Sequence, residues 1–166
     1  MKTSKFYNWI ALCTGALMLM GCPYSSTVPL SDAGIKVADN LIGKWEQPED
    51  AGVSIEIKRS GPNSVTVVKT EAGYEGGEPT ISNYEAFLTD INGTIFLNVR
   101  EVSEYEGSYY FYKLIRDGDF KLTIFPVTDN VRETFDNSEM MKKFFAANMQ
   151  NSYFFNTGEE TYYKVK

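Results

Sequence analysis

The chain of 166 residues contains no histidine and only two cysteines, Cys13 and Cys22. It therefore lacks the most common general base and the most common zinc ligand of proteins. It also lacks a phosphate-binding glycine loop, a G-x-S-x-G element and any metal-ligand spacing. Its carboxylates are numerous, but no pair stands out as a separate acid and base. We expect no catalytic residue, no metal site and no cofactor, and thus a protein that is not an enzyme.

Positive charge is scarce as well. The chain has 16 Lys and Arg against 22 Asp and Glu, a net charge of −6. Residues 1–21 carry two of the lysines and no acid, so the remaining 145 residues combine 14 positive with 22 negative charges, a net charge of −8. Such a surface repels phosphate backbones and anionic headgroups. We expect no nucleic-acid partner.

The N-terminus is typical of an export signal. Lys2 and Lys5 precede an apolar stretch, 6–20, that is too short for a membrane-spanning helix. This stretch ends in Leu19-Met20-Gly21-Cys22, which resembles the lipobox of bacterial lipoproteins. The resemblance implies that residues 1–21 are a lipoprotein signal peptide and that Cys22 receives a diacylglycerol, which attaches the protein to the membrane. An ordinary cleaved signal followed by a chance cysteine is the alternative.

The same resemblance implies a location in the cell envelope. Pro23 follows Cys22, and a residue other than Asp at this place resembles lipoproteins that are sent on to the outer membrane. Residues 23–40 are small, polar and proline-containing, without a sustained period of 2 or 3.6. We predict that 22–40 comprise the lipidated cysteine and a flexible tether, and that 41–166 form one domain of ordinary size.

Alternating patterns predict mostly strands after the tether. Val53, Ile55 and Ile57 alternate with polar residues. Asn92-Gly93 separates strand-like segments at 84–91 and 94–102, and Asp117-Gly118 separates 109–116 from 120–125. Both dipeptides suit tight hairpin turns, so the pattern favours an antiparallel meander.

One amphipathic helix is predicted before the last strand. Asp136 and Glu139 have the spacing of a capping box, and apolar residues then recur at helical spacing over 138–150. The final strand is expected at 161–165.

The motif Gly43-Lys44-Trp45 at the first strand of the meander resembles the G-x-W motif of lipocalins and other calycin-like barrels. The resemblance implies an all-β fold, an antiparallel up-and-down barrel of about eight strands with one helix before the last strand. It also implies that Gly43 and Trp45 close one end, with Lys164 as the cation over Trp45. A β-sandwich or an open curled sheet is the alternative.

Large apolar side chains are expected on both faces of the predicted sheet. The interior is predicted to contain aliphatic residues, with Leu97, Phe111 and Ile124 among the side chains that would fill it. Another set would face outward, beneath the helix residues Phe144 and Phe145 or as a docking patch: Phe96, Tyr110, Tyr112 and Phe125.

The sequence is compatible with two functions. A barrel filled by its own side chains would be an interaction scaffold for another envelope protein. A barrel with a cavity would bind a small apolar ligand, for which Tyr74, Leu97 and Phe111 are the candidate residues. Tyr74 lies in the polar, glycine-rich segment 71–83, the best candidate for a recognition loop.

Overall fold

The computed structural model describes residues 23–50, 52–102, 107–155 and 158–165. The predicted signal peptide, residues 1–21, and Cys22 lie outside the described residues, so cleavage and lipidation stay predictions. In the part of the chain that the structure describes, no helix is both long and apolar enough to span a bilayer.

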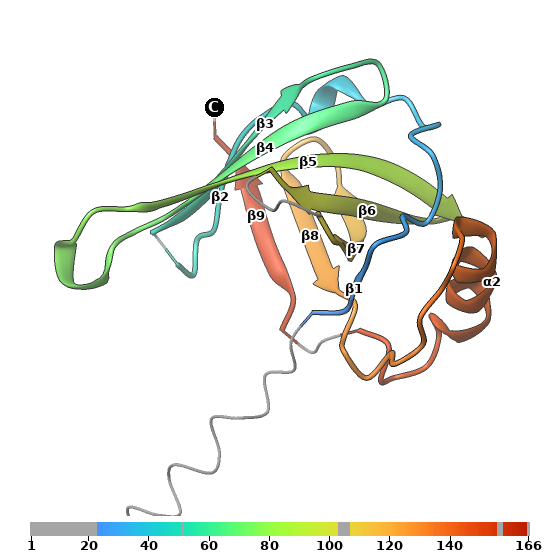
Figure 1. The fold of residues 1–166 in the computed structure, drawn as a ribbon. Coiled ribbons are helices and arrows are strands. Elements are labelled where there is room, and N and C mark those ends of the chain that lie inside the picture. The colour runs from blue at the N-terminus through green and yellow to red at the C-terminus, as the bar shows by residue number, and fades with distance from the viewer. Residues whose placement is uncertain (1–22, 51, 103–106, 156–157, 166) are drawn as a thin grey trace, which may run out of the picture.

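Eight antiparallel strands close into a barrel. Figure 1 shows the arrangement of these strands. In chain order they are β2 (Gly43–Glu46), β3 (Val53–Arg59), β4 (Ser64–Glu71), β5 (Thr80–Ile91), β6 (Thr94–Glu101), β7 (Tyr109–Asp117), β8 (Lys121–Pro126) and β9 (Glu160–Lys164). Each strand pairs with the next along the chain, and β9 also pairs with β2, which closes the ring. The short strand β1 (Ser25–Ser26) is added beside β7. The predicted up-and-down barrel is confirmed, and the sandwich alternative is wrong.

The hairpin turns form where the sequence predicts them. Asn92 and Gly93 have φ angles of 52° and 83°, in the left-handed region that this dipeptide tolerates. The Asp90 carboxylate accepts a hydrogen bond from the Gly93 amide at 2.7 Å, which fixes the turn. Gly118, with φ 64°, takes the corresponding place between β7 and β8.

The predicted helix is α2 (Ser138–Asn148), and it lies against the outside of the barrel (Figure 1). Its N-cap is Asn137, whose side chain accepts a hydrogen bond from the Met140 amide at 3.0 Å, so the expected cap at Asp136 is wrong by one residue. Phe145 is fully buried between α2 and the barrel wall. Its ring centroid lies 5.5 Å from that of Phe96 and 5.6 Å from that of Phe111. An aromatic outer core thus joins the helix to the sheet.

Strand β7 presents its two faces differently from the prediction. Phe111 pairs with Asn98 and lies in the outer core, whereas Tyr112 pairs with Leu97 and lines the barrel interior. Successive side chains of a strand point to opposite faces, so an error in the face assigned to one residue also reverses the face assigned to its neighbour. The expectation that Phe111 fills the interior and that Tyr112 faces outward is therefore wrong.

Residues 23–40 are packed against the barrel, and the prediction of a flexible tether is wrong for them. Tyr24, Leu30 and Val37 are buried, with exposed fractions of 7%, 0% and 2%. Buried Asn98 holds the segment in place: its Oδ1 accepts a hydrogen bond from the Leu30 amide at 2.9 Å, and its Nδ2 donates to Thr89 at 2.9 Å. These long-range contacts have no local sequence signature.

Candidate functional site

The two ends of the barrel have different chemistry, so we name them. The closed end contains the start of β2 and the end of β9, beneath the 3₁₀ turn η1 (Asp39–Leu41). The open end contains the end of β4, the starts of β5 and β7, and the start of β9.

Trp45 seals the closed end. Its side chain is 1% exposed, and its Nε1 donates a hydrogen bond to the Leu41 carbonyl at 3.0 Å. Lys164 lies opposite Trp45 in the β2–β9 ladder, with Nζ 5.3 Å from the indole centroid. The same Nζ donates to the Asn40 carbonyl at 2.8 Å. The contact expected between Lys164 and Trp45 is present, and it ties η1 to the last strand.

The backbone conformation at position 43 requires a glycine. Its φ angle is 133°, which L side chains rarely adopt, and a Cβ atom here would lie 3.1 Å from Cε of Lys164. Glycine therefore lets the lysine side chain cross the start of β2 on its way to Trp45.

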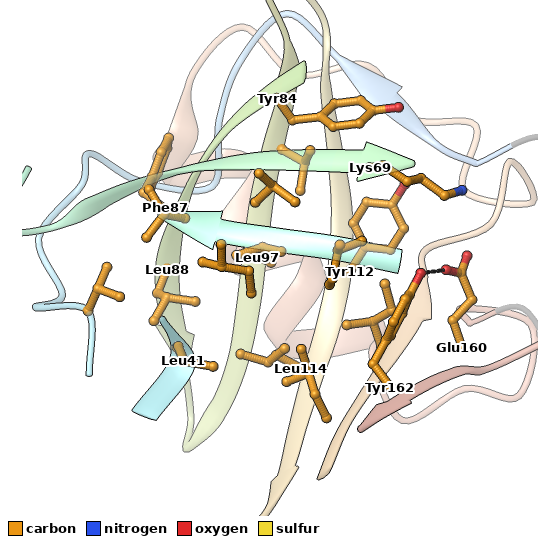
Figure 2. A pocket seen from close by; sticks show the side chains of 18 residues that line it. Leu41, Lys69, Tyr84, Phe87, Leu88, Leu97, Tyr112, Leu114, Glu160 and Tyr162 are labelled. Atoms are coloured by element: carbon orange, nitrogen blue, oxygen red, sulfur yellow. Dashed lines mark hydrogen bonds between the residues drawn. The ribbon is translucent and has the colours of Figure 1, made fainter. Parts of the chain in front are cut away.

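An apolar cavity of about 120 Å³ lies inside the barrel. Leu41 and Val37 form part of its wall on the side of the closed end, and aliphatic side chains from six strands complete most of the lining. Leu88, Leu97 and Leu114 are among these side chains (Figure 2). A predominantly apolar lining of this kind favours an apolar group over a polar one.

Polar groups gather on one side of this cavity, at the open end. Figure 2 shows the polar ends of Lys69, Tyr112, Tyr162 and Glu160 on the same side, with Tyr84 above them. The Tyr162 hydroxyl donates a hydrogen bond to Glu160 at 2.5 Å, and Gln47 donates to the same carboxylate oxygen at 3.3 Å. We call the five residues of the cavity lining at this end, Lys69, Tyr84, Tyr112, Glu160 and Tyr162, the polar rim.

Tyr112 and Tyr162 are hydrogen-bond donors rather than bases. Burial, followed by the negative charge of Glu160, raises the pKa of both Tyr112 and Tyr162 well above the ordinary value of 10.0. Both hydroxyls therefore keep their protons at neutral pH. The hydroxyls of Tyr84 and Tyr112 have no hydrogen-bond partner among the described residues, so both can serve a bound molecule.

Lys69 supplies a positive charge to the rim. Burial by itself lowers the pKa of this lysine, but the hydrogen bond with Glu71 and the charge of Glu160 outweigh it and raise the pKa above its ordinary value. Its Nζ lies 3.0 Å from the Glu71 carboxylate. Its side chain keeps 27% of its surface exposed, so the ammonium also has access to solvent at the mouth.

The structure separates the three predicted ligand residues. Leu97 lines the cavity. Phe111 lies outside the barrel under α2, and Tyr74 lies in the turn η2 (Tyr74–Gly76) with 88% of its surface exposed. The polar rim was not predicted from the sequence. Its one signal is the strand pattern of β4, in which Lys69 follows Val65 and Val67 at alternate positions and therefore shares their inner face.

Among the described residues, no group of three or more acidic, cysteine or histidine side chains could hold a metal ion. Comparison with known protein families, with curated proteins and with solved structures finds no significant match to this chain.

Proposed function

We propose that this protein is a lipid-anchored envelope protein without catalytic activity whose barrel binds the apolar end of a small amphipathic molecule. The observation that supports this most strongly is the cavity itself, which is apolar inside and bordered by a polar rim. Hydrophobic walls with a few converging polar groups are typical of small-molecule sites.

The volume limits the size of the bound group. Ligand pockets usually measure about 300–1,000 Å³, and this cavity measures about 120 Å³. An apolar cavity of about 150 Å³ is known to hold benzene. The bound group is thus a ring or a short aliphatic end, and the rest of the molecule extends past the rim.

The rim favours a hydrogen-bond acceptor in that outer part. Tyr84 and Tyr112 offer hydroxyl donors, and Lys69 offers an ammonium group. Two carboxylates lie near this ammonium: Glu71 pairs with it at 3.0 Å, and Glu160 accepts hydrogen bonds from Tyr162 and Gln47. A carboxylate on a short aliphatic chain combines both requirements, and hexanoate is a suitable probe.

The proposed anchor is the lipid on Cys22, which the lipobox-like segment implies and which would place the protein on the outer membrane. An interaction scaffold for another envelope protein is the second candidate. It is supported by the same small volume, because a barrel that is nearly filled by its own side chains can serve as a rigid frame.

The test is binding of hexanoate to the fragment 23–166, which contains both cores of the fold. Calorimetry and native mass spectrometry should detect one bound molecule. Leu97→Phe should reduce the affinity at least tenfold by occupying the cavity, whereas Phe111→Leu, outside the barrel, should leave it unchanged. Circular dichroism checks that both variants fold.

Two results would contradict ligand binding. In one, the wild-type fragment binds no hexanoate and carries no small molecule through purification, which favours the scaffold. In the other, Leu97→Phe folds and still binds with wild-type affinity, which would place the molecule elsewhere.

A further inference from the structure

We infer that the open end of the barrel is a membrane-docking surface, which turns the cavity mouth toward a zwitterionic lipid headgroup layer. The inference rests on the proposed lipidation of Cys22. It adds to the proposed function an orientation of the barrel relative to the membrane. In that orientation, single-chain amphiphiles dissolved in the bilayer are the source of the ligand.

The described part of the chain begins beside the open end of the barrel. Pro23 forms a β-bridge with Thr128, two residues past the end of β8 at Pro126. The end of β8 and the start of β9 lie together at the lower side of the barrel in Figure 1, where the blue N-terminal segment begins. Since β9 starts with Glu160 of the polar rim, the chain enters the fold beside the open end.

The connection between the proposed lipid on Cys22 and the folded barrel is short. Cys22 directly precedes Pro23 in the sequence, and consecutive α-carbons are about 3.8 Å apart, so a single residue step joins the proposed anchor to the described chain. Tyr24 is already fixed: its amide donates to the Val127 carbonyl at 2.8 Å, its hydroxyl donates to the Glu133 carbonyl at 2.9 Å, and it is 7% exposed. A lipid on Cys22 would thus hold this side of the open end within roughly 10 Å of the headgroups.

Apolar side chains are exposed at the same end of the barrel. The hairpin between β4 and β5 projects from the barrel to the left in Figure 1, with Tyr74 in its turn and Ile81 near the start of β5. Tyr74 is 88% exposed and Ile81 is 60% exposed. Val102, just past β6, is 58% exposed and donates its amide to the Asn83 carbonyl. Tyrosine and aliphatic side chains suit a membrane interface.

Charge then selects the kind of lipid. Acidic residues border these side chains. Glu71 at the end of β4 pairs with Lys69 at 3.0 Å, whereas Glu78 in the hairpin and Glu101 at the end of β6 have no basic partner among the described residues. Anionic headgroups would repel this end, whereas zwitterionic headgroups would not. The lipid anchor supplies the attachment, and the apolar side chains set the orientation.

The experiment uses the mature lipidated protein on phosphatidylcholine vesicles. A fluorophore is attached to a cysteine introduced by Tyr74→Cys at the open end or, as the matched control, by Phe120→Cys at the closed end, where Phe120 is 62% exposed. Spin-labelled lipids in the bilayer should quench the probe at position 74 several times more strongly than the probe at position 120. Equal quenching at the two positions would overturn the inference.

A second variant tests the short connection. Insertion of a flexible Gly-Ser segment between Cys22 and Pro23 should reduce the difference between the two positions severalfold. A difference of unchanged size would show that the short connection does not set the orientation. Vesicles with added anionic lipid should weaken quenching at position 74, and stronger quenching there would contradict the zwitterionic preference.

Mass spectrometry of the N-terminal peptide separates the two proposals. A diacylglyceryl group on Cys22 together with equal quenching means that the docking inference is wrong while the anchor stands. An unmodified Cys22 means that the anchor, and with it the docking surface, is wrong. Hexanoate binding by the fragment 23–166 does not depend on either result.

Discussion

Both ends of this barrel carry aromatic side chains and a lysine, but the polar groups of the two ends find hydrogen-bond partners to different extents. At the closed end, the Trp45 indole and the Lys164 ammonium both donate to backbone carbonyls of residues 40 and 41. At the open end, Tyr162 and Gln47 converge on Glu160, but the hydroxyls of Tyr84 and Tyr112 have no partner among the described residues.

The difference indicates which end is structural and which end is suited to binding. Buried polar groups are normally paired inside a fold, so a complete set of partners at the closed end points to stability. Free donors beside an apolar cavity point to a site that a ligand completes. Substitutions at the two ends should therefore have unequal costs.

The largest effect is expected for Trp45→Ala. Trp45 is 1% exposed and joins η1 to β9, so its truncation should lower the free energy of unfolding by about 3–5 kcal/mol. Urea denaturation followed by circular dichroism measures this change. A loss no larger than that of a typical surface substitution would contradict a structural role for the closed end.

Gly43→Ala should have the next largest effect. The φ angle of 133° is unfavourable for alanine, and the new Cβ would press on the Lys164 side chain. We expect a loss of about 1–3 kcal/mol in unfolding free energy. Gly93→Ala is a useful comparison, since its φ is also positive but no atom lies within 4 Å of the added Cβ. A smaller loss at position 43 than at position 93 would contradict the close approach of Lys164.

Alkaline pH should act mainly through the open end. Because the folded-state pKa of Tyr162 is raised above 10.0, the folded protein keeps a proton that the unfolded chain has lost. Stability is thus complete below about pH 10 and falls as the pH rises above it. Unfolding measured across this range should show a shallower decline for Tyr162→Phe. Trp45→Phe, the control, should lower stability equally at every pH, and an unchanged slope in Tyr162→Phe would count against the burial of this hydroxyl.

The smallest effect is expected for Tyr112→Phe. Its hydroxyl has no partner among the described residues, so its removal should change the unfolding free energy by no more than about 0.5 kcal/mol. The same change should weaken hexanoate binding, because it removes a rim donor. A clear loss of stability with unchanged binding would reverse the roles that we give to the two ends.

Local patterns were sufficient to predict much of this fold. The turn at Asn92-Gly93, the alternation in β3 and the helix before β9 all depend on neighbours in sequence. Trp45 was recognisable from its motif-like setting after Gly43.

The errors arose where distant contacts decide the outcome. Strand β7 has large rings on both faces, so no period-2 contrast showed that Tyr112 points inward and Phe111 outward. Residues 23–40 look like a linker because the polar partner of Leu30 is Asn98, 68 positions along the chain. The cavity likewise depends on how side chains from several strands fill one volume, which no single segment encodes.

The most direct test of the account is a map of backbone amide chemical shifts in the fragment 23–166 during titration with hexanoate. We predict saturable shifts at Lys69, Tyr84, Leu97 and Tyr112, with Trp45 and Lys164 nearly unchanged. Shifts confined to the closed end or to the outer core around Phe111, or no saturable shifts at all, would contradict the assignment of the open end as the binding end.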